Sequence, residues 1–192
     1  DVDRFIMARM ESKRLIPVAD ADRRTLLRRL SFDLTGLPPS TEDMTAFEND
    51  PSDQAIERAV DRLLASPRSG EKWARHWLDL VRYADTCGYE RDQEKPHAWK
   101  YRDWVIAAFN SDLPWSQFII EQLAGDEVAN PDEETLVATG FCRNAPSNDD
   151  NMGNNKEQYR LDELDDVIST TATVFLGVTV GCARCHDHKT DP

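Results

Sequence analysis

The amino-acid sequence predicts an all-α fold: a compact multi-helix domain in which a C-x-x-C-H motif follows the last long helix. Three observations support this prediction. Apolar residues recur at intervals of three and four along most of the chain. Capping residues, glycines and prolines interrupt the pattern at distances typical of helices, and no strand pair with alternating polarity stands out. Counting the periodic segments gives about eight helices.

The first two predicted helices lie near the N-terminus. The first covers residues 2–13 and places four apolar residues at helical spacing: Val2, Phe5, Ile6 and Met10. The second is expected to begin at a cap on Asp20 and to end at Gly36, because aspartate favours N-caps and glycine favours C-caps.

Two further helices are predicted before residue 67. Pro38 and Pro39 mark a turn, and Ser40 or Thr41 then caps the third helix. Ser52 is expected to cap the fourth helix. Its buried stripe is predicted to contain Ile56, Val60, Leu63 and Leu64.

The next helix, over residues 70–85, is strongly amphipathic and carries the first histidine. Its notable residues are Trp73, His76, Trp77, Leu80 and Val81. A polar loop over residues 86–100 separates it from a helix over residues 101–112.

The C-terminal part continues the helical pattern. Pro114 begins another helix, and a short helix is predicted within residues 131–141. Residues 143–155 have no hydrophobic period and are expected to form a long loop. The last helix covers residues 156–177 and presents Tyr159, Leu164, Val167, Ile168 and Phe175.

Length and composition restrict the class of protein. A chain of 192 residues predicts one domain, residues 1–192, which can bury a core without disulfides or metals. It starts with Asp1 and ends four residues after its densest cluster of chemical groups, so we expect a fragment of a longer exported protein. The net charge of −13 disfavours nucleic acid and anionic membrane surfaces as partners and attracts cations. No apolar run is long enough for a membrane helix.

Chemistry is concentrated in the sequence "GCARCHDHKTDP" at the end of the chain. "CARCH" is the C-x-x-C-H sequence to which c-type haem is attached. Cys182 and Cys185 have the spacing to form thioethers with the two vinyl groups of one porphyrin edge. His186 then lies under the ring, where its imidazole can coordinate the iron. The motif therefore predicts covalent haem c, with His186 as the proximal iron ligand.

Two other readings of the cluster stay open. Cys182, Cys185, His186 and His188 could hold zinc, although adjacent Cys185 and His186 would strain to bind one tetrahedral ion. The two cysteines could also form a redox-active dithiol, although "CARC" lacks the strand-to-helix setting of thioredoxin motifs.

Six blocks of the chain resemble, in order, the planctomycete cytochrome-type domain known as DUF1549 or PSCyt2. They are "LTGLPPS", "EKWARHWLDLVRYAD", "WKYRDWVIAAFN", "QLAGD", "VATGF" and "FLGVTVGCARCHDHKTDP". The resemblance covers nearly the whole chain. It implies one piece of a large exported protein, commonly upstream of a second domain, DUF1553. It also implies a c-type haem protein, without assigning it a reaction.

The sixth iron ligand has several candidates. His76 matches the family's "RHWLD" block and is the tentative distal ligand; the alternative is a core histidine bonded to a carbonyl group. His188 is a weak candidate, because two residues cannot carry the chain to the opposite face of the ring. His97 and Met152 lie in predicted loops.

Other residues have possible roles around a haem. Arg82, Arg102 and Arg160 could bind propionates or carboxylates, but surface salt bridges are the default expectation. The acidic stretch 162–166 could bind a cation or could simply be solvated. If haem takes two cysteines, Cys87 and Cys142 form the one possible disulfide in the chain; two unrelated thiols are the alternative.

Three functional hypotheses follow. The first is a haem domain that transfers electrons in an extracytoplasmic protein, periplasmic or exported, to a redox partner or a neighbouring DUF1553-like domain. The second is a haem-dependent oxidoreductase acting on a small molecule or polysaccharide. The third is a non-redox metal knuckle or interaction module. The sequence leaves open whether the protein is an enzyme.

Overall fold

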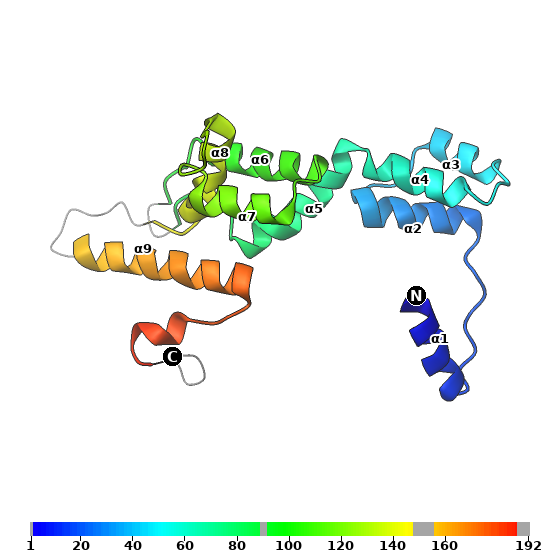
Figure 1. The fold of residues 1–192 in the computed structure, drawn as a ribbon. Coiled ribbons are helices and arrows are strands. Elements are labelled where there is room, and N and C mark those ends of the chain that lie inside the picture. The colour runs from blue at the N-terminus through cyan, green and yellow to red at the C-terminus, as the bar shows by residue number, and fades with distance from the viewer. Residues whose placement is uncertain (1, 89–91, 148–155, 188–192) are drawn as a thin grey trace. The chain divides into compact units, whose positions relative to one another are not determined.

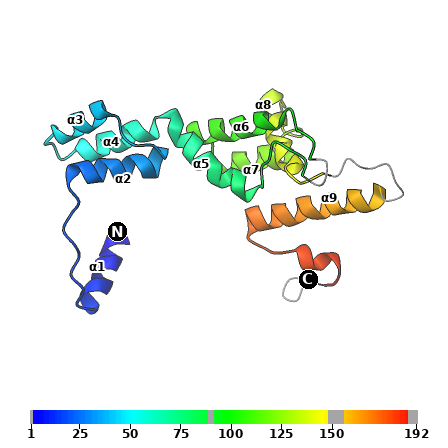
Figure 2. The same cartoon turned by 180° about the vertical axis from the view of Figure 1, so that it is seen from behind.

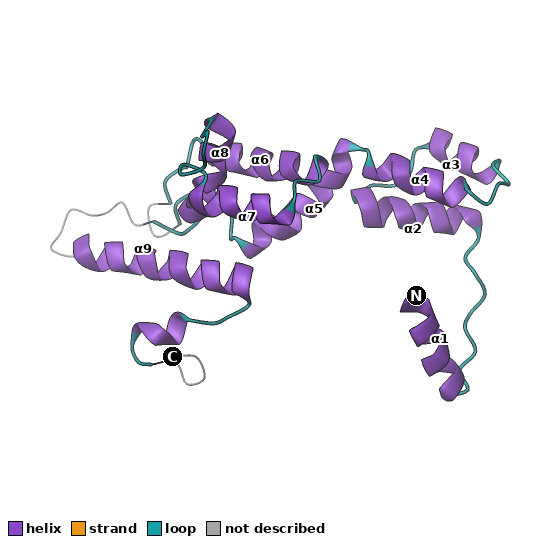
Figure 3. Ribbon diagram, in the orientation of Figure 1, coloured by secondary structure: helices purple, strands orange, loops and turns teal. Residues whose placement is uncertain are grey.

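A computed structural model describes residues 2–88, 92–147 and 156–187. In these residues the chain forms nine α-helices and three short turns of 3-10 or π helix (Figure 3). The same residues contain no named strand, only one isolated antiparallel bridge between Thr86 and Glu94. The predicted all-α class is therefore confirmed. None of the described helices is both long and apolar enough to cross a membrane.

The contacts of the chain divide it into two units, residues 1–62 and residues 63–192. The first contains α1 (Val2–Ser12), α2 (Arg23–Thr35), α3 (Thr41–Glu48) and most of α4 (Ala55–Leu64) (Figure 1). The second contains α5 to α9. The expectation of a single domain over residues 1–192 stays a prediction.

The helix boundaries in the first unit follow local capping. The N-cap of α2 is Asp22 instead of the predicted Asp20, because the Asp22 carboxylate accepts a hydrogen bond from Thr25 N at 2.9 Å. Gly36 ends the helix in the left-handed region at φ 72°, as predicted. Ser40 caps α3 through a 3.0 Å bond from Asp43 N, which confirms the first of its two candidate caps.

The core of the first unit is small, and part of its predicted composition was wrong. Its buried residues are Leu27, Phe47, Ala55 and Ala59. Helix α4 packs through its alanines, so the buried face is turned by one residue from the predicted stripe, and Ile56 and Leu64 are exposed. The Ser52 hydroxyl accepts a hydrogen bond from Arg58 at 2.6 Å and does not cap α4 through its side chain. Helix α1 is present, but it buries no residue.

An aromatic core holds the second unit together. It joins α5 (Pro67–Leu80), α6 (Ala98–Asn110), α7 (Trp115–Ala124) and α8 (Glu133–Ala138), which lie together in both views (Figures 1 and 2). Trp77 packs edge-on against Phe118, and Trp104 stacks on the same ring. Helices α5 and α6 approach closely at Gly70, where any Cβ would overlap the Asn110 amide. The Asn110 Oδ1 accepts a 2.9 Å bond from Gly70 N.

A hydrogen-bond network lies inside this core. The Gln122 side chain is 0 % exposed; its Oε1 accepts bonds from Tyr101 Oη at 2.6 Å and from Trp77 Nε1 at 3.0 Å. Its amide nitrogen donates to Phe118 O at 2.9 Å. Tyr101 is buried, and this burial raises its pKa well above its usual range.

The last long helix leads into the cysteine motif. Helix α9 covers Lys156–Thr171 and continues as a π-helical turn over Ala172–Leu176. Gly177 ends it at φ 67°, as the sequence predicted for this helix. The Phe175 ring contacts the rings of Trp77 and Phe141, with centroids 5.7 and 5.1 Å apart. The π-helical turn therefore anchors the end of α9 to the core.

Candidate functional site

The cysteine motif forms one tight turn. Residues Gly181–Arg184 make a 3-10 turn, and Cys185 and His186 continue from it. The carbonyl oxygen of Cys182 accepts bonds from Cys185 N at 3.2 Å and from His186 N at 3.4 Å. Both thiols and the imidazole are therefore brought onto a single turn of backbone. Cys182 and Cys185 are exposed free thiols, and His186 is also exposed.

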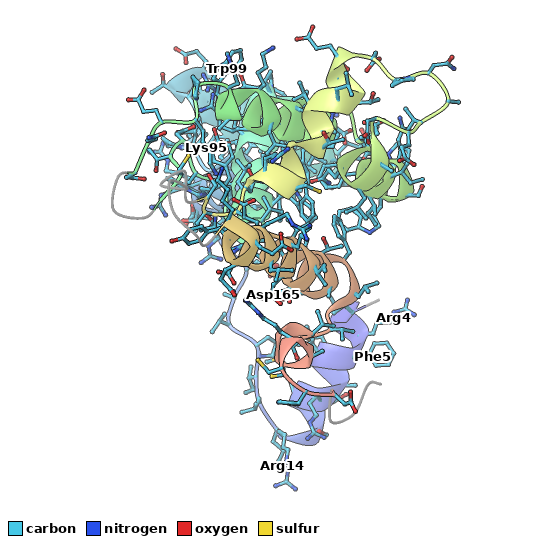
Figure 4. All side chains as sticks on the ribbon, turned by 90° about the vertical axis from the view of Figure 1, so that its left-hand side faces the viewer. Arg4, Phe5, Arg14, Lys95, Trp99 and Asp165 are labelled. Atoms are coloured by element: carbon cyan, nitrogen blue, oxygen red, sulfur yellow. The ribbon has the colours of Figure 1, made fainter. Side chains whose placement is uncertain are left out.

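Arg184, between the two cysteines, fixes this turn to α9. Its guanidinium pairs with the carboxylates of Asp162 and Asp165, the latter at 3.3 Å. The bond from Arg184 lowers the pKa of Asp162, and the same bond raises the pKa of Arg184. Figure 4 labels Asp165 on the side of α9 that faces the turn. Two carboxylates of the predicted acidic stretch 162–166 therefore position the motif.

The orientation of His186 is defined by a backbone contact. Its Nδ1 lies 2.8 Å from Asp187 O. A carbonyl oxygen only accepts, so a hydrogen bond here requires the proton on Nδ1. The lone pair of Nε2 is then available to a metal ion, the arrangement in which metal-binding histidines are commonly held.

Apolar surface lies beside the motif. Leu161 and Ile168 share the α9 face of Asp165, four residues before it and three after it. They are 45 % and 60 % exposed, and Leu164 between them is 44 % exposed. These three residues form an exposed apolar stripe on the helix that binds Arg184.

The candidate sixth ligands are dispersed or outside the described residues. His76 lies exposed on α5 with its ring 5.5 Å from that of Trp73. The core-histidine alternative was therefore wrong, because the adjacent Trp77, about 100° further around α5, is the residue that enters the core. The role of His76 as the distal iron ligand stays a prediction. His97 is exposed at the start of α6; His188 and Met152 lie outside the described residues.

The three arginines form the salt bridges expected by default. Arg82 pairs with Asp166 through two bonds of 2.6 Å, and this contact joins the loop after α5 to α9. Arg102 pairs with Asp103, and Arg160 with Glu157, each close in sequence. Of these three pairs, the Arg82 pair is the one that connects distant parts of the chain.

Cys87 and Cys142 line one cavity of 510 Å³ in the second unit, together with residues around Tyr101 and Pro146. Cys87 is buried and Cys142 is half-buried, and both are free thiols in this structure. Burial raises the pKa of the Cys142 thiol. In the described part of the chain no three His, Cys, Asp or Glu residues are grouped to hold a metal ion.

Fold and site together define an all-helical protein with an exposed cysteine-pair motif that is tethered to its last long helix. The chain belongs to the PSCyt2 family, described as a protein of unknown function (DUF1549), whose model matches residues 1–192. No curated protein and no solved structure matches the chain.

Sequence reasoning missed Arg184 as the residue that positions the motif. The signal was present, because Arg184 follows an acidic stretch on the preceding helix. The register of the intervening turn, however, could not be read from the sequence.

Proposed function

We propose that this chain is a c-type haem-binding domain that transfers electrons within a larger extracytoplasmic protein. The observation that carries the proposal is the C-x-x-C-H sequence on one exposed turn, with both thiols free and the Nε2 atom of His186 available. Cys182 and Cys185 would anchor the porphyrin, and His186 would bind its iron. Haem, when bound, supplies one-electron redox chemistry.

The remaining residues hold and surround this site. Arg184 connects the turn to α9 through two aspartates, and the contact of His186 Nδ1 with Asp187 O orients the imidazole. Leu161, Leu164 and Ile168 offer apolar surface, which would exclude water from one side of the group and so affect its reduction potential. Electron transfer is favoured over substrate oxidation because the motif is exposed, which suits contact with a redox partner or a neighbouring DUF1553-like domain.

Zinc binding by the same residues has less support. A structural zinc site takes four ligands, and the described residues provide no group of three. His188, which a knuckle would need, lies outside the described residues.

The proposal is tested by producing the chain in a periplasm that contains haem-attachment machinery. We expect a pyridine haemochrome spectrum of haem c and a mass increase of one haem. Cys182→Ala and Cys185→Ala should each reduce covalent attachment, whereas Cys142→Ser, at the half-buried thiol of the other pair, should leave it unchanged.

Unmodified thiols in all preparations would refute the proposal. Stoichiometric zinc bound by the same preparations would instead favour the knuckle.

A further inference from the structure

A second cavity lies away from the cysteine turn. It has a volume of 690 Å³ and is lined by residues of α6, α7, α8 and their connections, none of them in the motif. This volume is within the range of small-molecule sites. Its apolar wall includes Trp104, Leu113, Ile120 and Val128.

The charged residues of this cavity have one sign. Glu121, Asp132 and Glu134 line it, and no lysine, arginine or histidine does. Asp132 also caps α8, where its Oδ1 accepts a bond from Thr135 N. The cavity is therefore complementary to a cation, and the net charge of −13 would add to the attraction.

The burial of the Glu121 carboxylate is the observation that points to a ligand. It is only 8 % exposed, and its Oε1 accepts a 2.7 Å bond from Gln117 Nε2. In the described part of the chain its carboxylate forms no ion pair. Burying a carboxylate without a cation costs free energy, so a positive group that entered the cavity would recover part of that cost.

The shape of the site favours an organic cation over a metal ion. The described residues contain no group of three His, Cys, Asp or Glu that could hold a metal, so the cavity's carboxylates do not converge on one point. Leu113 and Ile120 instead offer contact to an apolar body. We propose that this cavity binds a small primary ammonium compound with an apolar body, and that Glu121 is its counter-ion. This site does not depend on haem.

Titration calorimetry of the 192-residue chain with benzylammonium tests the proposal, with benzyl alcohol as the uncharged probe. We expect saturable binding of benzylammonium and at least about tenfold weaker binding of the alcohol, because the alcohol has no positive charge to pair with the Glu121 carboxylate. Glu121→Gln should weaken benzylammonium binding by a similar factor. Glu127→Gln removes the same charge from an exposed residue that does not line the cavity, and should leave binding unchanged.

Thermal unfolding separates a binding role from a structural one. Glu121→Gln keeps a group that can accept the Gln117 bond and removes the buried charge. The ligand-free variant should therefore unfold at a higher temperature than the original chain. Benzylammonium should raise the unfolding temperature of the variant by less than it raises that of the original chain. Ser116→Phe, at an exposed residue of the cavity wall, should block binding and leave the unfolding temperature unchanged.

Four results would each overturn the proposal. They are the absence of saturable benzylammonium binding, equal binding of benzyl alcohol, displacement of benzylammonium by Mg²⁺ or Ca²⁺ at matched ionic strength, and unchanged affinity in Glu121→Gln.

Discussion

The buried network around Gln122 gives a prediction with a definite magnitude. Gln122→Met keeps an unbranched side chain of similar size but removes the acceptor of Tyr101 Oη and Trp77 Nε1. Trp77 Nε1 retains Tyr101 Oη at 3.1 Å, so the Tyr101 hydroxyl is the donor left without a partner. The variant also loses the bond from the Gln122 amide nitrogen to Phe118 O. One unsatisfied buried donor and three lost bonds should together lower the free energy of unfolding by about 2–4 kcal/mol.

Urea unfolding followed by tryptophan fluorescence measures this change. All five tryptophans lie between residues 73 and 115, so the signal reports on the second unit alone. The control is Gln93→Met at an exposed position, which should stay within about 0.5 kcal/mol.

A double variant sharpens the test. Tyr101→Phe removes the donor that Gln122→Met leaves unsatisfied. The double variant should therefore lose less free energy of unfolding than the two single variants lose in total. A loss below about 1 kcal/mol for Gln122→Met, with an unchanged denaturant slope, would show that the network does not stabilise the unit.

Three other predictions concern the backbone and the charges. Gly177→Ala should lower the free energy of unfolding by about 1–2 kcal/mol, because φ is 67° at this residue. Gly181→Ala should change it little, and equal losses in the two variants would contradict the strain argument. The bond from Arg58 lowers the pKa of Asp50 to about 2. The ionised Asp50 carboxylate therefore stabilises the fold fully above pH 3.8, and this contribution is lost as the pH falls through about 2. Carboxyl NMR should show Asp50 titrating nearer 3.8 in Arg58→Gln. By the same measurement, Arg184→Gln should raise the pKa of Asp162, and Arg160→Gln should not change it.

Local signals in the sequence were enough for some helix boundaries, whereas the helices predicted over residues 70–85 and 101–112 begin three residues earlier and end five and two residues earlier. Gly36 and Gly177 end their helices in the left-handed conformation that glycine permits, and Ser40 caps α3 through its own hydroxyl. These features depend on a few neighbouring residues, so they can be read without tertiary structure.

Features that depend on packing were predicted less well. Helix α4 buries Ala55 and Ala59 because small residues allow close approach. Hydrophobic periodicity alone could not show whether this face or the adjacent aliphatic face would be buried. The face on which His76 lies depends on which tryptophan of α5 enters the core, and the sequence alone did not distinguish Trp73 from Trp77. The cavity around Glu121 joins three helices and has no sequence signature.

The cysteine turn contributes no buried residue, and this has a consequence for biogenesis. No residue of the turn belongs to the aromatic core of the second unit, so under the proposed function haem attachment would not be needed for this core to form. A haem-attachment enzyme would then act on a folded protein whose cysteine turn is accessible.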